Sequence, residues 1–326
     1  MLPLYPLLFK PILKEKIWGG KKLGEILGKP AHQTDLCGES WELSGVKGNI
    51  SVVREGPLKG HSLSDLIEEY GASLLGEKVV QEYGHEFPLL VKFIDANQDL
   101  SIQVHPNDEL AQARHNGRGK TEMWYLFQVD PEASLITGFS KPLNKDQYLQ
   151  HLQTKSLDQI LNREKVQAHD VFFIPAGRVH TIGKGILLAE IQQTSDITYR
   201  IYDFDRVDQQ GNKRELHLEQ ALDAMDFNHY PQYKTSYEQS PNKLAPLVAC
   251  PYFNVNRLFF NQTTTRDYRD LDSFVIYVCV EGALQVRWDE QHVTLKQGDT
   301  ALIPALIKEV TLIPKSPYKV LEAYIA

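Results

Sequence analysis

Short apolar runs dominate this sequence, and turn residues follow each of them. The runs are rich in Val, Ile, Leu, Phe and Tyr, which is typical of strands in a β-sandwich or barrel. At 326 residues the chain is long enough for two domains. We therefore expect a mainly β protein. The runs are FPLLVKFIDA (87–96), EMWYLFQV (122–129), VFFIPA (171–176), ILLAEIQQ (186–193), SFVIYVCV (273–280) and KVLEAYIA (319–326).

Three segments with helical periodicity interrupt the strands, at residues 62–83, 144–164 and 216–225. Ser64 is the expected N-cap of the first helix. Residues 226–246 are polar, with prolines and several tyrosines, so we interpret them as a connection between two β units.

An internal repeat supports two units. HDVFFIPAGRVH (169–180) aligns with GDTALIPALIKE (298–309), and each copy has an aspartate five residues before a proline. The second copy has Leu306 in place of Gly177 and Glu309 in place of His180. The second copy has therefore lost a turn and a histidine that the first copy keeps.

Four side chains in the first half could surround a metal ion. Gln103 and His105 alternate with apolar residues on one predicted strand and share a face. Glu122 begins another strand, and His180 follows the PAG turn. Two histidines and a glutamate with an open position are typical of catalytic zinc. A histidine on an apolar strand is, however, more often structural than a ligand, so spacing alone leaves both interpretations open.

Charged residues near these strands suggest an anionic substrate. Asp196 and Arg200 share one face of the stretch 196–202, and Lys120 lies on the same face as Glu122. Arg200 needs an anionic ligand or an ion pair with Asp196 or Asp203. Lys120 could hold an oxyanion or phosphate, or be an ordinary surface lysine.

Three further residues are candidates for a substrate pocket. Lys92 lies between apolar residues, so it either reaches the surface or lines a cavity. Glu42 belongs to ESWELS, in which Glu39 and Trp41 share one face and Ser40 and Glu42 the other. Trp18 precedes a pair of glycines, and its alternative role is in the core.

Composition excludes some classes of partner. The formal net charge is −7, and lysine and arginine form no long run, so nothing suggests nucleic acid. There is no apolar stretch of membrane-spanning length. The proline-rich N-terminus is interpreted as a strand rather than a signal peptide. Three scattered cysteines suggest reduced thiols in a cytoplasmic protein.

Six motifs in order resemble those of type I mannose-6-phosphate isomerases, particularly the shorter bacterial form. The resemblance covers roughly residues 5–206, with a weaker β-rich C-terminus. The motifs are GESWELS (38–44), FPLLVKFIDA (87–96), LSIQVHP (100–106), GKTEMWY (119–125), FFIPAGRVHTI (172–182) and EIQQTSDITYRIYDFDR (190–206).

The resemblance implies two cupin-like jelly-roll barrels, the second without a metal site. We expect a catalytic domain over 1–240 and a degenerate cupin over 241–326. The resemblance also implies one zinc ion and interconversion of mannose 6-phosphate and fructose 6-phosphate. It places the zinc ligands at Gln103, His105, Glu122 and His180, the catalytic arginine at Arg200 and a motif lysine at Lys120. His169 departs from the glycine usual in cupins.

The expected reaction passes through a cis-enediol, with Arg200 stabilising or orienting oxygens because its pKa is too high for a base. The base is left open between a hydroxide at the metal and a carboxylate, Glu42 or Asp196. Lys92, Glu42, Asp196 and Trp18 are expected to bind substrate. The alternatives are another phosphosugar isomerase, a cupin dioxygenase and a non-catalytic sugar-binding cupin. We expect a monomer or weak homodimer.

Overall fold

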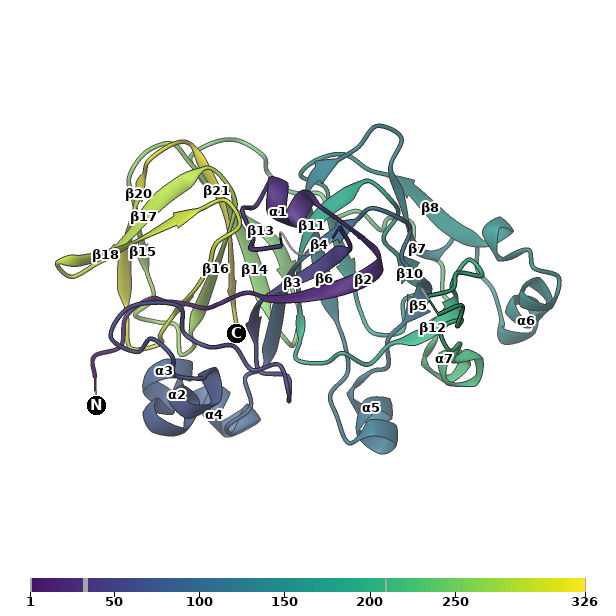
Figure 1. Cartoon of the computed structure of the whole chain (residues 1–326), viewed down its shortest axis with the longest axis horizontal. Coiled ribbons are helices and arrows are strands. Elements are labelled where there is room, and N and C mark those ends of the chain that lie inside the picture. The colour runs from purple at the N-terminus through teal and green to yellow at the C-terminus, as the bar shows by residue number, and fades with distance from the viewer. Residues whose placement is uncertain (1, 32–34, 209, 326) are drawn as a thin grey trace.

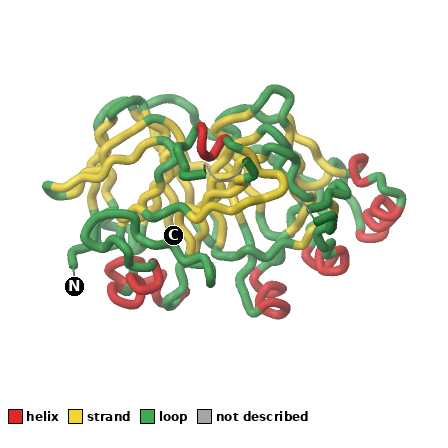
Figure 2. Tube along the Cα trace, viewed as in Figure 1, coloured by secondary structure: helices red, strands yellow, loops and turns green. Residues whose placement is uncertain are grey.

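The computed structural model describes residues 2–31, 35–208 and 210–325, and it is mainly β. Its strands form two bodies, with most helices at their outer edges (Figures 1 and 2). Each body contains two sheets. We call the body with β2–β12 the first unit and the body with β1 and β13–β21 the second unit. The predicted fold class, a mainly β chain with a few inserted helices, is confirmed.

The first unit pairs a six-stranded sheet with a five-stranded sheet. In spatial order, the six-stranded sheet contains β2 (Ile12–Gly20), β3 (Cys37–Ser44), β4 (Leu89–Ala96), β11 (Ile186–Gln193), β6 (Glu122–Val129) and β9 (Val171–Ile174). The five-stranded sheet contains β12 (Tyr199–Tyr202), β5 (Ile102–Val104), β10 (His180–Thr181), β7 (Ser134–Phe139) and β8 (Leu161–Lys165).

The second unit pairs another six-stranded sheet with a four-stranded sheet. In spatial order, the six-stranded sheet contains β1 (Leu7–Leu8), β19 (Thr300–Ile303), β16 (Val275–Glu281), β21 (Tyr318–Tyr324), β14 (Asn254–Phe260) and β13 (Lys243–Ala249). The four-stranded sheet contains β15 (Thr264–Asp267), β20 (Glu309–Pro314), β17 (Ala283–Trp288) and β18 (Gln291–Lys296).

The central strands are buried on both faces, which explains their nearly continuous apolar sequences. In β11, Leu187 and Ala189 pack in a core shared with the six-stranded sheet of the second unit. The alternate residue Leu188 packs toward the five-stranded sheet. Period-two alternation therefore directs the next inward residue, Glu190, into the interior of the first unit.

The second unit repeats the strand pairing of the first without the predicted metal ligand Glu122. Ile174 of β9 pairs with Glu122 of β6, and Ile303 of β19 pairs with Val275 of β16. Because Ile174 and Ile303 occupy matching places in the internal repeat, Val275 stands where the first unit has Glu122. A valine cannot coordinate a metal, so the second unit lacks this ligand.

The division of the chain into two domains at residue 240 remains a prediction. It does not account for the N-terminal strand, which belongs to a sheet of the second unit. The N-terminal strand β1 pairs with β19, so Leu7 and Leu8 belong to the sheet of the second unit. The chain then enters the first unit through β2. The second unit therefore contains chain from both ends of the sequence.

The predicted helix over 62–83 is three short helices, α2 (Leu63–Tyr70), α3 (Ala72–Leu75) and α4 (Glu77–Tyr83). Gly71 and Gly76 separate them with φ angles of 47° and 98°. The N-cap is Ser62 rather than Ser64, because Ser62 accepts from the backbone N–H of Asp65 and completes a capping box. The N-cap prediction was wrong by two residues.

The predicted helix over 144–164 is correct only in its first part. Helix α6 spans Lys145–Gln153 and the 3₁₀ helix η1 spans Leu157–Gln159, and the residues from Leu161 onward form β8 against β7. Helix α7 (Leu218–Ala224) lies within the predicted 216–225. Two helices were not predicted, α1 (Lys22–Glu25) and α5 (Asp108–His115). Helix α5 buries only Ala111, so it has no apolar stripe to detect.

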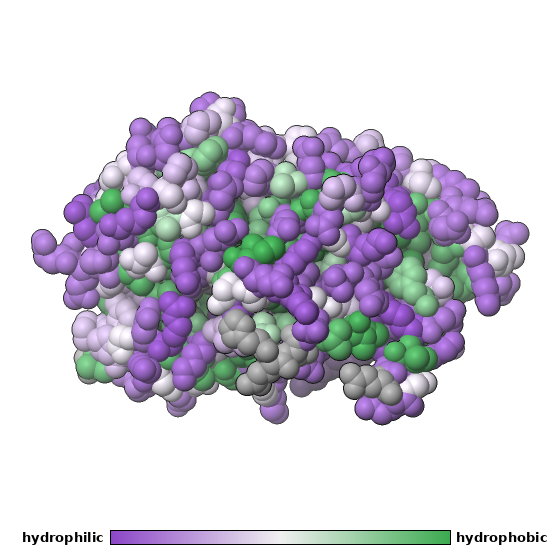
Figure 3. Space-filling model, turned by 45° about the horizontal axis from the view of Figure 1, so that its top comes forward, coloured by the Kyte–Doolittle hydropathy of each residue, from purple (hydrophilic) through white to green (hydrophobic). Residues whose placement is uncertain are grey.

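None of the described helices has the length and apolar character needed to cross a bilayer. The face of the molecule in Figure 3 is largely hydrophilic, and its hydrophobic patches are small and separate.

Candidate metal centre and substrate pocket

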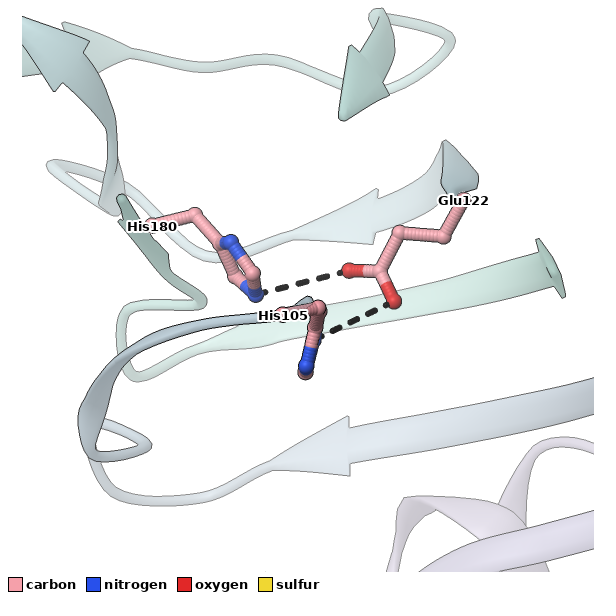
Figure 4. Close-up of side chains that lie close together, drawn as sticks. All are labelled: His105, Glu122 and His180. Carbon is pink, nitrogen blue, oxygen red and sulfur yellow. Dashed lines mark ion pairs between the residues drawn. The ribbon is translucent and has the colours of Figure 1, made fainter. Parts of the chain in front are cut away.

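Three strands and a turn bring the four predicted ligands together. Gln103 lies on β5, His105 follows it, Glu122 begins β6 and His180 begins β10. His180 is paired directly with Gln103 in the five-stranded sheet. Glu122 reaches the same place from the facing six-stranded sheet (Figure 4).

The two histidines and the glutamate form a compact, buried group. Nε2 of His105 lies 3.6 Å from Oε2 of Glu122, and Nε2 of His180 lies 3.5 Å from Oε1. All three side chains are at most 1% exposed. It is the one group of His, Cys, Asp and Glu side chains in the described part of the chain whose ligand atoms converge within 4.8 Å.

Backbone carbonyls orient both imidazole rings. Nδ1 of His105 lies 2.8 Å from the carbonyl oxygen of Ile197, and Nδ1 of His180 lies 2.8 Å from that of Arg178. A carbonyl only accepts, so each Nδ1 carries the proton and each Nε2 presents a lone pair to the centre. Burial lowers the pKa of His180 to about 3 and that of His105 well below its usual value. Both rings are therefore neutral, as metal ligands require.

The centre has more acceptors than donors. Oε1 of Glu122 is buried without a hydrogen-bond partner among the described residues, and two imidazole lone pairs face the same carboxylate. Burial and the neighbouring Glu190 raise the pKa of Glu122. An unpartnered buried acceptor is costly, and a divalent cation would satisfy it. The set of nitrogen and oxygen donors fits zinc.

Gln103 lies beside the group, and its amide oxygen is a potential fourth donor. Its amide nitrogen lies 3.2 Å from Nε2 of His180, and its amide oxygen accepts from the hydroxyl of Ser101 at 3.3 Å. Half a turn about its last side-chain bond would present the oxygen to the centre instead. Gln103 also lines the adjacent pocket, so it lies between the metal centre and solvent.

Lys120 lies against the centre and also lines the pocket. Its Nζ is 2.9 Å from Nε2 of His105 and 2.5 Å from Oε2 of Glu122. It is only 5% exposed, which excludes the alternative of an ordinary surface lysine. The prediction that Lys120 shares a face with Glu122 is confirmed.

The pocket brings together most of the substrate-binding residues proposed from sequence. Lys92 is buried, and its Nζ lies 3.1 Å from Oε1 of Glu190. Burial lowers the pKa of Lys92, but Glu190 and Glu39 outweigh it and the net shift is upward, so the ammonium stays charged. The lining comprises Lys16, Trp18, Glu39, Trp41, Lys92, Ile94, Leu100, Ser101, Gln103, Lys120, Ile182, Glu190, Asp196, Thr198, Arg200 and Arg214.

One wall of this pocket, which we call the arginine wall, consists of Arg200 and Arg214. Nη1 of Arg200 donates to the carbonyl of Glu215 at 2.8 Å, and its buried Nε has no hydrogen-bond partner among the described residues. Burial and the neighbouring Arg214 lower the pKa of Arg200. No ion pair of the described residues joins Arg200 to Asp196 or Asp203; Asp203 binds Arg206 and Arg214 instead. Two arginines thus pair with the carboxylate of Asp203 and Arg200 does not, so the wall carries excess positive charge.

Glu42 is not in the pocket. Its carboxylate binds Nζ of Lys29 at 2.6 Å and the hydroxyl of Ser40 at 2.5 Å, on the face of β3 opposite Glu39 and Trp41. Burial raises its pKa. The structure therefore places Glu42 away from the substrate side, and Asp196 is the carboxylate of the two candidates that lines the pocket.

Sequence reasoning did not assign four of the charged lining residues: Lys16, Glu39, Glu190 and Arg214. Glu190 had a detectable signal, because it alternates with apolar residues and pairs in register with Lys92. Its carboxylate also accepts from the indole N–H of Trp124 at 2.9 Å. Arg214 lies in an irregular segment, so no periodicity could have directed it to the pocket.

Comparison with known proteins finds similar sequences and structures along most of the chain. The family model described as phosphomannose isomerase type I, catalytic domain, matches residues 7–139, and the one described as mannose-6-phosphate isomerase, cupin domain, matches residues 244–315. The chain is 38% identical over 311 residues to mannose-6-phosphate isomerase ManA of Bacillus subtilis, covering 94% of this chain and 95% of the relative. It is 35% identical over 305 residues to mannose-6-phosphate isomerase of Streptococcus mutans, covering 93% of each. A crystal structure of the mannose 6-phosphate isomerase from Bacillus subtilis has a TM-score of 0.88 at 32% identity, covering 98% of this chain and 99% of that chain.

Proposed function

This chain belongs to the type I mannose-6-phosphate isomerases, and from that premise we propose a zinc-dependent reaction at the His105–Glu122–His180 group. The single observation that supports it best is the unpartnered, buried Oε1 of Glu122, in a carboxylate that faces two neutral imidazoles. This arrangement calls for a cation. Through Gln103 and Lys120 it adjoins a pocket with an arginine wall.

We propose that His105, Glu122, His180 and Gln103 hold one zinc ion. Zinc supplies Lewis acidity, which stabilises negative charge that develops on a sugar oxygen. The neutral rings need no deprotonation to bind it, because their pKa values are already lowered by burial.

The residues of the pocket divide the remaining tasks. Interconversion of mannose 6-phosphate and fructose 6-phosphate moves a proton between C2 and C1 through a cis-enediol. We assign the proton transfer to Asp196, which lines the pocket without an ion pair among the described residues. Lys120, beside the centre, stabilises the enediolate oxygens. Arg200, whose Nε is unpartnered, orients the same oxygens.

We assign the phosphate to Arg214 in the arginine wall. Asp203 binds Nε of Arg214 at 2.7 Å and Nη2 at 2.5 Å, which fixes the guanidinium in one orientation. The excess charge of the wall suits a dianion. Lys92 is held by Glu190, and we assign it with Trp18 to binding the sugar.

The cellular setting follows the predictions from sequence. All three cysteines are free thiols, which supports a reducing, cytoplasmic location. We propose a monomer or weak homodimer that acts on a phosphosugar.

His180→Ala tests the ligand assignment. We expect the variant to lose bound zinc and ~1000-fold or more of the isomerase activity. The reason is that a bound cation stabilises the charge that develops in the transition state by several kcal/mol. Metal content by elemental analysis and a coupled assay for fructose 6-phosphate measure both. His292→Ala, an exposed histidine of β18 in the second unit, is the matched control. A His180→Ala variant that kept metal and activity would show that the assignment is wrong.

A further inference from the structure

The segment 117–121 enters β6 and carries Lys120, and three successive backbone N–H groups of this segment are fixed from outside it. We propose that Asp108 is a positioning residue, which sets the place of Lys120 against the metal centre. The proposal rests on the role of Lys120 in the proposed function. Asp108 closes the stretch LSIQVHPND that also supplies Gln103 and His105.

The contacts of Asp108 reach both neighbours of Lys120. Its Oδ1 accepts from the backbone N–H of Gly119 at 2.8 Å and from Nε2 of Gln193 at 3.1 Å. Oε1 of Gln193 in turn accepts from the backbone N–H of Thr121 at 2.8 Å. The N–H of Lys120 itself donates to the carbonyl of Pro106 at 3.1 Å.

Close packing of the backbone shows that this approach is tight. A Cβ on Gly119 would lie 2.6 Å from the backbone nitrogen of Asp108 and 2.7 Å from the carbonyl carbon of Asn107. Only glycine allows the segment to come so near the start of α5. The hydrogen bonds of Asp108 therefore act at a point where the two backbones already touch.

Positioning matters here because Lys120 has a long, flexible side chain in a confined place. Its Nζ lies within 2.9 Å of His105 and within 2.5 Å of Glu122. A displacement of the order of 1 Å at a catalytic group can cost ~100-fold in rate. Glu122 is less dependent on Asp108, because it is already paired with Ile174 and Gln192 within the sheet.

The second unit also lies close to this network. Burial, together with the nearby Asp108 carboxylate, raises the pKa of Tyr252, in the turn between β13 and β14, to about 12. The unit without a metal site thus approaches the residue that positions Lys120.

A purely structural alternative exists for Asp108. It is the first residue of α5, after the N-cap Asn107, and an acidic side chain in the first turn stabilises a helix. Glu109 occupies the same turn, is exposed and has no hydrogen bond or ion pair with the segment 117–121 among the described residues. Glu109→Ala is therefore the matched control for loss of a first-turn charge.

The test compares Asp108→Ala, Asp108→Asn and Glu109→Ala in the zinc-loaded enzyme, with and without Lys120→Ala. We expect Asp108→Ala to lower kcat ~10- to 100-fold, with KM changed by less than ~3-fold and zinc content unchanged. Asp108→Asn should restore most of kcat, because its amide oxygen can accept both hydrogen bonds. In the Lys120→Ala background, Asp108→Ala should cost less than ~2-fold, because the residue it positions is gone.

The proposal is overturned if Asp108→Ala has the activity of Glu109→Ala while Lys120→Ala is impaired, or if the two losses multiply in the double variant. If Lys120→Ala alone were fully active, the proposed function of Lys120 would fail, which is a separate result. Gln193→Met keeps the side-chain volume but removes the link to Thr121. If Asp108→Ala does not fold, the same fall in kcat and the same coupling to Lys120 are required of Gln193→Met.

Discussion

At the scale of single residues, the distribution of charge separates the two ends of the pocket. Acceptors converge at the metal centre, where Oε1 of Glu122 has no donor. Cations gather at the arginine wall, where Asp203 pairs with Arg214 and with the nearby Arg206 while Arg200 has no ion pair with it. A phosphosugar has its reacting oxygens at one end and its phosphate at the other. This matches the arrangement of acceptors and cations in the pocket.

Arg214→Ala tests the phosphate assignment. We expect KM for mannose 6-phosphate to rise ~10- to 100-fold, because a hydrogen bond to a charged group contributes about 1.5–3 kcal/mol, with kcat changed by less than ~3-fold. Inhibition by inorganic phosphate should weaken in parallel. Lys213→Ala is the control, since Lys213 is exposed and pairs with Asp205. An unchanged KM in Arg214→Ala would move the phosphate elsewhere.

The residues on strands could be predicted because alternation fixes which way they point. This rule placed Gln103 with His105 and Lys120 with Glu122, and it also put Glu42 on the face opposite Trp41, where the structure has it. Alternation does not say which face is the pocket, so Glu42 was offered as a candidate base. Arg214 lies outside any strand, and only the folded chain brings it to the wall.

At the scale of elements, glycines decide where the helices end. Gly76 has a φ of 98°, and a Cβ there would lie 2.5 Å from the carbonyl oxygen of Asp272 in the second unit. Leu75 and Leu74 of α3 also accept backbone hydrogen bonds from Phe274 and Ala305. The break after α3 is therefore also a contact between helices α2–α4 and the second unit.

Gly76→Ala should lower the free energy of unfolding by roughly 1–3 kcal/mol through backbone strain, and by more through the clash with Asp272. Gly71→Ala is the control, because its φ is also positive but its Cβ would meet nothing within 4 Å. Urea denaturation of both variants measures the difference. Equal losses in the two variants would contradict a specific contact at Gly76.

The presence of helices in these segments was predicted better than where each helix begins and ends. Apolar periodicity continues through 62–83 although Gly71 and Gly76 break the backbone, since periodicity reports burial and not φ. The last part of 144–164 forms β8 because it pairs with β7, and no local sequence pattern reveals this tertiary contact.

At the scale of the whole molecule, the two units are joined by a large core and by a histidine. The six-stranded sheets pack against each other through apolar side chains such as Val91 and Leu321. His169, with a φ of 74°, bridges the units: Nε2 lies 2.9 Å from Nζ of Lys319, and Nδ1 lies 3.0 Å from the hydroxyl of Tyr125.

His169 should make the stability of the joined units depend on pH. Burial and Lys319 lower its pKa below the usual 6.5, with Arg257 acting in the same direction and Glu281 and Asp170 opposing. Between 6.5 and the lower folded-state pKa the unfolded chain binds more protons, so stability falls as pH falls through that window.

We expect His169→Asn, which tolerates a positive φ, to show a smaller loss of stability than the parent between pH 7.5 and 5.5. The difference between the two urea midpoints, followed across this range, isolates His169 because every other histidine is common to both proteins. A constant difference at all pH values would contradict the prediction.

The most direct test of the account is isomerisation of mannose 6-phosphate by the intact protein, before and after removal of metal by a chelator and again after addition of zinc. Activity that disappears on chelation and returns with about one zinc per chain is the result that the acceptor-rich His105–Glu122–His180 group predicts. Full activity in a folded, metal-free sample would contradict the proposal that a cation at this group carries the reaction.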